Sequence, residues 1–387
     1  MPVDSQLTDG LLRELVAIDS VNPSLVPGAR GEQAVAEFLR DWLRGQGIAA
    51  GLQFAGPGRP NVVATIGHAA TGGARPALLL NGHIDTVGAG DMSDPFTPRE
   101  CDGRLYGRGA VDMKAGIAAM CAAAAAIVKD KVPLARPFVI SAVVDEECNS
   151  IGTQELVKQY TADAAVVLEP TDLKLGIAHK GFAWYEVVTH GRAAHGSLPA
   201  VGRDAIRMMG RVLDKLDQLD RALAARPPHR WLGAASLHAS LIEGGQELSS
   251  YPAECRLQLE RRTLPGETDA PLDAELRALL DELQARDTDF RATSRFMFSR
   301  PPYVIEPNAP IVRATAEAVR KCGGEVNYSG LSFWTDTAIL AQAGIPGVIF
   351  GPSGAGLHGA DEYVTLGSVF RCAQVIYRLL LTCCSPR

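Results

Sequence analysis

The stretch LLLNGHIDTV, residues 78–87, places the apolar run 78–80, closed by Asn81 and Gly82, just before His83 and Asp85. Apolar runs without alternation are typical of strands that are buried on both faces of a sheet. Runs of the same kind lie at 61–66, 138–144 and 164–168, and helix-like segments separate them. Because strands alternate with helices, the sequence predicts an α/β fold in which helices cover a mixed sheet.

The pattern of the chain changes near Gly181. Four strand-like segments and two helix-like segments follow in the order β-α-β-β-α-β, with the strands at 184–189, 236–243, 254–262 and about 290–298, and the helices at 205–223 and 272–283. This order is that of a split βαβ, ferredoxin-like α+β domain. We therefore predict an inserted α+β domain at residues 181–299, between two parts of a catalytic domain at residues 1–180 and 300–387.

Composition restricts the class of protein. With 387 residues, 47% of them hydrophobic and 21% charged, the chain has the composition of an ordinary globular protein large enough for two domains. The net charge is -6, and the sequence has no run of basic residues that could bind along a phosphate backbone, so we expect no nucleic-acid partner. The uncharged stretch 115–128 is too short to cross a bilayer of ~30 Å, so it predicts a buried helix and no membrane span.

Two features favour a cytoplasmic location. The first ten residues contain neither the basic nor the apolar region of a secretory signal. The eight cysteines form no C-x-x-C pair, which is typical of reduced thiols.

The first candidate residues lie at the end of one apolar run and before the alanine-rich stretch 115–128. His83 and Asp85 are two apart at a strand end, so their side chains point to the same face, and Asp85 can orient a histidine that binds metal. The alternative is a histidine that is simply hydrogen-bonded at the end of a strand. Asp112 stands in a glycine-rich loop before the alanine-rich helix, where it is either a ligand or the N-cap of that helix.

Carboxylates follow two further strands. The run 138–144 leads into Asp145, Glu146 and Glu147, and the run 164–168 ends at Glu169. Adjacent carboxylates at the end of an apolar strand repel one another unless cations compensate them. A solvated acidic turn is the alternative for 145–147, but repeated carboxylates at one edge of a sheet favour a metal site.

Two histidines lie later in the chain. His358 is in a glycine-rich loop that follows the strand-like run 347–350, and His195 lies in the inserted domain. A single histidine is more often a surface residue than a catalytic one. Together, however, five residues offer two imidazoles and three carboxylates: His83, Asp112, Glu147, Glu169 and His358.

This donor set suits zinc, or a neighbouring divalent ion such as cobalt or manganese. If one carboxylate bridges, each of two metal ions has three protein ligands and a shared water, which is the open arrangement of catalytic sites. Glu146 is then free to act as a base.

The chain resembles a known family, the acetylornithine deacetylase and succinyl-diaminopimelate desuccinylase family, which includes aminoacylases, glutamate carboxypeptidases and carnosine dipeptidases. The motifs that carry the resemblance occur in order along nearly the whole chain: GHIDTV (82–87), YGRGAVDMKAGIAA (106–119), DEE (145–147), LEP (168–170), GRAAHGS (191–197), ERRTLPGE (260–267), FWTDTAILAQAGIPGVIFGP (333–352) and HGADEYV (358–364).

The resemblance implies a role for each candidate residue. His83 and Glu169 hold one zinc ion, Glu147 and His358 hold the other, and Asp112 bridges them. Asp85 orients His83, and Glu146 is the general base. The peptide bond between Asp112 and Met113 is expected to be cis.

The resemblance also implies a homodimer. The inserted domain is then a lid or dimerisation domain that pairs two chains, His195 reaches the active site of the partner as an electrophile, and Arg262 binds a substrate carboxylate. Two departures bear on substrate identity. The segment GGQELSSYP (244–252) lacks the asparagine that many relatives carry there, and MSDPF (92–96) has Asp94 where many have tryptophan.

The sequence therefore predicts a cytoplasmic, dinuclear zinc amidohydrolase that removes an acyl group from an N-acyl amino acid. A dipeptidase or carboxypeptidase with the same residues is the first alternative. A non-catalytic binding protein on the same fold is the second, and Glu146 argues against it because a binding protein needs no base.

Overall fold

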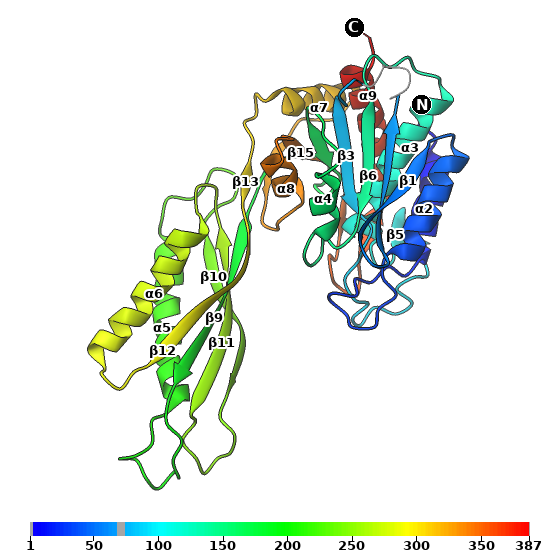
Figure 1. The fold of residues 1–387 in the computed structure, drawn as a ribbon. Helices are drawn as coiled ribbons and strands as arrows, with labels where there is room; N and C mark the ends of the chain where they lie inside the picture. Colours follow the sequence, from blue (N-terminus) through cyan, green and yellow to red (C-terminus); the bar gives the residue numbers. More distant parts are fainter. Residues whose placement is uncertain (1–2, 68–73, 387) are drawn as a thin grey trace. The chain divides into compact units, whose positions relative to one another are not determined.

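The structure is a computed structural model that describes residues 3–67 and 74–386. The chain divides into two compact units. Unit 1 contains Met1–Ile177, Ile305–Ser329 and Thr335–Arg387, and unit 2 contains Ala178–Val304 and Gly330–Trp334. Unit 2 is therefore inserted into the chain of unit 1 (Figure 1).

A sheet of nine strands forms the centre of the fold. Its order is β1-β2-β6-β3-β7-β15-β8-β13, and β14 also pairs with β8. The bounds of these strands are β1 Ala50–Gly56, β2 Arg59–Ile66, β3 Leu78–His83, β6 Phe138–Val143, β7 Ala165–Val167, β8 Leu175–His179, β13 Tyr303–Val304, β14 Tyr328–Leu331 and β15 Gly347–Ile349.

Four adjacent strands of this sheet, β6, β3, β7 and β15, run parallel, whereas β2 and β8 pair with them in the antiparallel sense. Every residue of β3, β6 and β7 is buried, as their apolar runs predict. The carboxyl ends of the four parallel strands lie at one edge of the sheet, which is where open α/β sheets bind ligands.

Helices cover this sheet on both sides. The chain moves from β3 to β6 in one direction and from β6 to β7 in the other, so right-handed connections place α3 and α4 on opposite faces (Figure 1). The helices α3 and α9 pack against each other, as do α4 and α8. The bounds are α1 Ser5–Ala17, α2 Gln33–Gly45, α3 Ala115–Lys129, α4 Ile151–Leu156, α7 Pro310–Lys321, α8 Thr337–Gln342 and α9 Leu366–Cys384.

Two helical segments are long and apolar enough to cross a membrane by length and composition alone. They are Ala110–Lys129, with 89% of its most apolar window buried, and α9, with 56% buried. The core helix of a protein that spans no membrane passes the same test. The burial of α3 on all its faces is that of the core helix expected from residues 115–128.

A second, smaller sheet positions two loops of unit 1. Its order is β16-β17-β5-β4, with β4 at Arg99–Cys101, β5 at Arg104–Tyr106, β16 at Gly354–Ala355 and β17 at Tyr363–Thr365. Because β17 pairs with β5, the loop that follows β5 lies beside the loop that precedes β17. The first loop carries Asp112 and the second carries His358.

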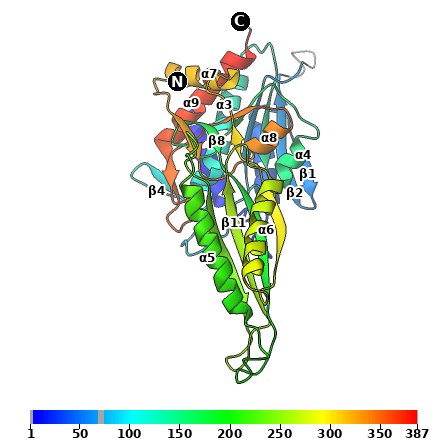
Figure 2. The same cartoon turned by 90° about the vertical axis from the view of Figure 1, so that its left-hand side faces the viewer.

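Unit 2 has the predicted order β-α-β-β-α-β. Its antiparallel sheet runs β10-β11-β9-β12, and α5 and α6 pack on one face around an apolar core that includes Tyr185, Leu257 and Phe290 (Figure 2). The bounds are β9 Gly181–His190, α5 Ala205–Ala224, β10 Ser236–Gly244, β11 Glu254–Thr263, α6 Asp269–Arg286 and β12 Ala292–Arg300.

The predicted fold class is confirmed: the catalytic part is a helix-covered mixed α/β sheet and the insertion is a ferredoxin-like α+β unit. The last strand lies at 292–300 and not at 290–298. Phe290, 1% exposed, belongs to the core of unit 2 but precedes the strand, so its apolar side chain placed the predicted start too early.

Candidate metal centre

The candidate ligands of unit 1 follow the carboxyl ends of its parallel strands. His83 is the last residue of β3, Glu146 and Glu147 follow β6, and Glu169 follows β7 by two residues. His358 lies in the loop between β16 and β17. The structure brings these residues together with Asp112, although they are far apart in the sequence.

Their side chains form two trios that share Asp112. The Nε2 atom of His83 lies 3.1 Å from Asp112 Oδ1 and 3.7 Å from Glu169 Oε1. The Nε2 atom of His358 lies 3.3 Å from Asp112 Oδ2 and 3.2 Å from Glu147 Oε2. Each oxygen of Asp112 therefore faces a different imidazole.

Asp112 does not act as a helix cap. Helix α3 begins at Ala115 after Lys114, and no side chain caps it. The peptide bond between Asp112 and Met113 is cis, so that prediction is confirmed. The carboxylate of Asp112 is free to serve the two trios.

Burial and crowding shift the pKa values of the carboxyl groups. Burial, together with the charge of Glu169, raises the pKa of Glu146 well above its usual value. Burial also raises the pKa of Glu169 well above its usual value, and burial with the charge of Asp112 raises that of Glu147 to about 7. Negative charge therefore exceeds the positive charge that the surrounding side chains supply.

The two histidines respond in the opposite sense. Hydrogen bonds to Asp112 and Glu147 raise the pKa of His358 to about 10. Burial disfavours a charged His83. The charge of Glu169 and the hydrogen bonds of His83 to Asp112 and Asp85 outweigh burial and raise the pKa of His83 well above its usual value. In the metal-free cluster, bound protons on these histidines and carboxyl groups therefore compensate the excess negative charge.

The side chains present fit divalent cations. Within the described residues, two groups offer ligand atoms that all lie within 4.8 Å of one another: His83, Asp112 and Glu147, and His83, Glu146 and Glu169. In addition, Glu147 Oε1 is buried and has no hydrogen-bond partner among the described residues. A buried carboxylate oxygen without a donor is stabilised by a metal ion.

Asp85 supports the site in two ways. Its main-chain carbonyl lies 3.0 Å from His83 Nδ1, whereas its Oδ1 atom lies 3.5 Å away, so the carbonyl is the nearer partner of the imidazole. Its carboxylate accepts the main-chain N–H groups of Glu146 (3.1 Å) and Glu147 (3.2 Å). Asp85 therefore holds the turn that carries both glutamates.

Sequence reasoning missed the groups behind Asp85. Asn22 Nδ2 donates to Asp85 Oδ2 at 2.8 Å and to Asp145 Oδ1 at 3.0 Å. Arg59 donates to Asp145 at 2.9 Å and also pairs with Glu32. No local motif marks these residues, because their partners are 27 to 123 positions away.

The other two candidate residues belong to unit 2. His195 is exposed, and its Nδ1 atom accepts the main-chain N–H of Ser197 at 3.2 Å. The same Nδ1 atom lies 2.8 Å from Ser197 Oγ, and with Nδ1 as the acceptor a neutral imidazole carries its proton on Nε2. Arg262 Nε lies 2.6 Å from Glu260 Oε1, and its guanidinium lies 5.4 Å from the centre of the Phe182 ring.

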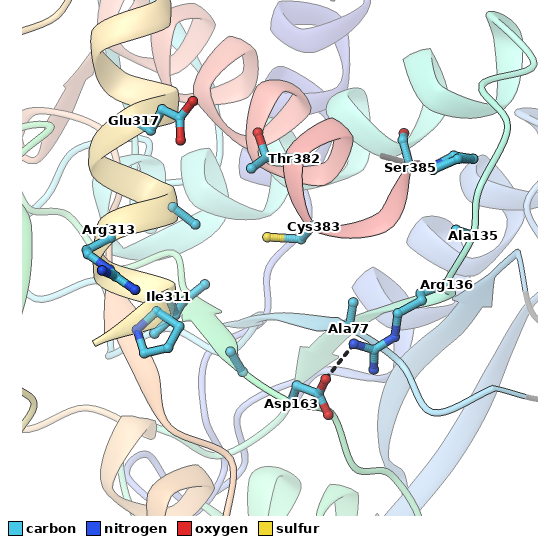
Figure 3. Close-up of a pocket in the computed structure, with 14 residues that line it drawn as sticks. Ala77, Ala135, Arg136, Asp163, Ile311, Arg313, Glu317, Thr382, Cys383 and Ser385 are labelled. Carbon is cyan, nitrogen blue, oxygen red and sulfur yellow. Dashed lines mark hydrogen bonds and ion pairs between the residues drawn. The ribbon is translucent and has the colours of Figure 1, made fainter. Parts of the chain in front are cut away.

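A cavity of about 950 Å³ lies elsewhere in unit 1 (Figure 3). It is lined by residues that precede β3, β6 and β7 and by residues of α7 and α9, among them Ala77, Arg136, Asp163, Arg313 and Cys383. It therefore lies at the opposite edge of the sheet from the candidate ligands.

The chain matches a known protein family and a curated relative over most of its length. The model of peptidase family M20/M25/M40 matches residues 79–382. Acetylornithine deacetylase from Myxococcus xanthus is 30% identical over 391 aligned residues that cover 97% of each chain.

Solved structures share the fold. A tripeptidase from Staphylococcus aureus superposes with a TM-score of 0.81 at 22% identity, covering 98% of each chain. A dinuclear metal-binding peptidase of the M20 family from Bacillus subtilis superposes with a TM-score of 0.74 at 15% identity, also over 98% of each chain.

Proposed function

The chain belongs to peptidase family M20/M25/M40, whose members are metal-dependent amidohydrolases and peptidases, and from that premise we propose that it removes the acyl group from an N-acyl amino acid. The observation that carries the proposal is the pair of trios around Asp112, with Glu146 beside them. A linear amide would be cleaved to a carboxylate and an amine.

We assign the five ligands to two divalent ions. His83 and Glu169 would hold one ion, Glu147 and His358 the other, and Asp112 would bridge them. The orientation of the two Asp112 oxygens supports this assignment. Zinc suits the mixed imidazole and carboxylate donors best, and cobalt or manganese are the other candidates. Such ions, when bound, lower the pKa of a bound water to about 7 and polarise a carbonyl oxygen.

Glu146 would move the proton in this reaction. It directly precedes Glu147 in the same turn, and among the described residues no group donates a hydrogen bond to its carboxylate, so it remains available to a water molecule. Glu146 takes one proton from the attacking water while the water oxygen bonds to the amide carbon. It then delivers that proton to the leaving nitrogen as the carbon–nitrogen bond breaks.

Two residues of unit 2 complete the proposal. His195, with its proton on Nε2, would donate a hydrogen bond to the oxyanion in the active site of a partner chain. Arg262 would bind the carboxylate of the substrate, in competition with Glu260, its present partner. The proposal therefore includes a homodimer, and it places the enzyme in the cytoplasm with small-molecule substrates.

The similarity to acetylornithine deacetylase supports an N-acetyl amino acid as the substrate. A dipeptidase or carboxypeptidase would use the same water and the same Glu146 on a peptide bond. A binding protein on this fold would have no use for Glu146.

A hydrolysis screen tests the proposal. The protein is freed of metal, loaded with Zn²⁺, Co²⁺ or Mn²⁺, and given a panel of N-acetyl amino acids and dipeptides, and the released acetate and amine are measured. We expect two ions per chain and acetate release. Hydrolysis of dipeptides alone would favour the peptidase, and bound metal with no hydrolysis of any amide would favour the binding protein.

A further inference from the structure

Glu362 is a buried carboxylate whose two oxygens are both fully hydrogen-bonded. Its Oε1 atom accepts the main-chain N–H groups of Val111 at 3.0 Å and Asp112 at 3.2 Å. Its Oε2 atom accepts the N–H of Gly109 at 3.0 Å and Nη1 of Arg108 at 2.7 Å. The loop that carries Asp112 therefore donates four hydrogen bonds to this one side chain.

Arg108 extends the same contact to two other segments. Its side chain is 1% exposed. Its Nε atom donates to the carbonyl of Gly88 at 3.1 Å, and its Nη2 atom donates to the carbonyls of Ala89 at 3.3 Å and His358 at 3.4 Å. Gly88 and Ala89 follow the segment of His83 and Asp85. The guanidinium thus joins three segments, and each of them contains a candidate ligand.

The main chain of Glu362 adds to this arrangement. Its carbonyl accepts the N–H of Gly107 at 3.2 Å, and β17 begins at the next residue and pairs with β5. Glu362 lies four residues after His358. The His358 loop and the Asp112 loop are consequently fixed to each other by main-chain and side-chain bonds at once.

We propose that Glu362 and Arg108 are positioning residues that hold Asp112 and His358 at the spacing required by two divalent cations. The inference rests on the proposed function, because it concerns the same metal centre. It goes further in assigning this role to two residues that touch neither the cations nor the substrate. Metal–ligand distances tolerate errors of only about 0.2 Å, so a loop that moves with Glu362 weakens metal binding.

The substitution Glu362→Gln tests this role. It preserves the size of the side chain but turns one acceptor oxygen into an NH₂ donor, which then faces either Arg108 or the N–H groups of the loop. Metal-free protein is titrated with Zn²⁺, and again with Co²⁺ while the visible absorption is recorded. We expect about 10- to 100-fold weaker binding of at least one ion and an altered Co²⁺ spectrum.

A matched control is available in unit 2. Glu267 also accepts a hydrogen bond from a buried arginine, Arg261, at 2.7 Å, and another from the main-chain N–H of Leu264 at 2.8 Å. Glu267→Gln should lower thermal stability but leave both metal affinities and the Co²⁺ spectrum at wild-type values. A general effect of losing an ion pair to a buried arginine is thereby separated from an effect on the metal centre.

The outcomes are distinct. A folded Glu362→Gln chain that binds both ions with wild-type affinity overturns the inference and leaves the proposed function intact. If that variant does not fold, Arg108→Lys decides: it keeps a cation opposite Glu362 but loses the forked contacts to Ala89 and His358, and wild-type affinity in this variant overturns the inference. A wild-type chain that binds fewer than two ions overturns the proposed function, and the inference with it.

Discussion

The two edges of the central sheet in unit 1 differ sharply in their chemistry. The strands β3, β6 and β7 run from one edge to the other. Their carboxyl ends lead to the cluster of His83, Glu146, Glu147 and Glu169, and their amino ends line the cavity of about 950 Å³. The same three strands therefore position a buried ionic cluster and an open cavity.

The charged side chains at the two edges differ in their burial and in their pairing. At the carboxyl ends, buried carboxylates outnumber their cationic partners, and the pKa values of Glu146 and Glu169 are raised mainly by burial. At the amino ends, Arg136 and Asp163 pair with each other, and their side chains are 38% and 47% exposed. Convergent buried charge, and not the volume of a cavity, is the reason that we propose the carboxyl-end edge as the reactive edge.

The largest effect is expected from Glu146→Ala. Loss of a general base typically lowers turnover by ~10²–10⁴-fold, and the loss is greater where the base also positions the water. Because Glu146 is assigned to proton transfer and not to ligation, metal content should stay near two ions per chain. Turnover and metal content are measured on the same preparation.

Glu147→Ala is the comparison that interprets this result. It should lose metal together with activity, because Glu147 is assigned as a ligand. The carboxylate of Glu146 also lies within 4.8 Å of ligand atoms of His83 and Glu169. If Glu146→Ala loses metal and Glu147→Ala keeps it, the two glutamates have the opposite roles.

A second large effect would show whether the reactive edge is sufficient on its own. If His195 completes the site of a partner chain, His195→Ala should be inactive alone. When it is mixed with the inactive Glu146→Ala chain and subunits exchange, one site of each hybrid dimer has both groups intact. About half the chains sit in hybrids at equal mixing, so roughly a quarter of wild-type activity is the maximum recovery.

Two other results would contradict that prediction. Near-normal activity of His195→Ala would mean that His195 is an ordinary surface histidine. An inactive variant that never recovers, despite confirmed subunit exchange, would mean that the histidine serves its own chain.

The reactive edge was largely predictable from sequence for a physical reason. Each candidate ligand of the sheet lies within three residues of the end of an apolar run, as His83 follows 78–80 and Glu169 follows 164–168, so the strand and the ligand form one local pattern. Parallel strands then bring those ends to the same edge. The ferredoxin-like insertion was predictable because its helices and strands are long.

The support of the site was not predictable in the same way. Arg108 and Glu362 are 254 positions apart, and Asn22 and Asp85 are 63 apart. The pairing of Arg108 with Glu362 depends on the small sheet, whose strands have only two or three residues and no periodicity to detect. Such contacts follow from the tertiary structure alone.

The third prediction concerns pH. Metal ions bind the deprotonated ligands, but in the metal-free protein the pKa of His358 is about 10 and that of Glu147 is about 7. Binding must therefore release protons, so metal affinity should rise with pH, about tenfold per pH unit for each proton released. Proton release from His358 contributes to this dependence below about pH 10, and proton release from Glu147 makes the affinity rise more steeply below about pH 7. Competition with a chelator at pH 6, 7 and 8 measures this dependence.

The stability of the metal-free protein should change in the opposite sense. His358 has a raised pKa, so its ion pairs stabilise the fold fully below about 6.5, and this contribution is lost as the pH rises through about 10. Glu147 holds a proton more tightly in the folded state, so its contribution also falls as the pH rises from about 4.5 to about 7. The gap in unfolding temperature between zinc-loaded and metal-free protein should widen from pH 6 to pH 9, and a constant gap would contradict the assignment.

The smallest effect is expected at the opposite edge, from Asp163→Asn. Asp163 pairs with Arg136 and, at 3.1 Å, with Arg75, and all three side chains are at least 38% exposed. Exposed ion pairs contribute about 0.2–1 kcal/mol each, so the free energy of unfolding should fall by no more than ~2 kcal/mol, and by less in high salt because the charges are screened. Metal content and kcat/KM should stay at wild-type values, since no candidate ligand contacts this cluster. A tenfold loss of kcat/KM with unchanged stability would show that the edge with the cavity takes part in the reaction, and the contrast between the two edges would then fail.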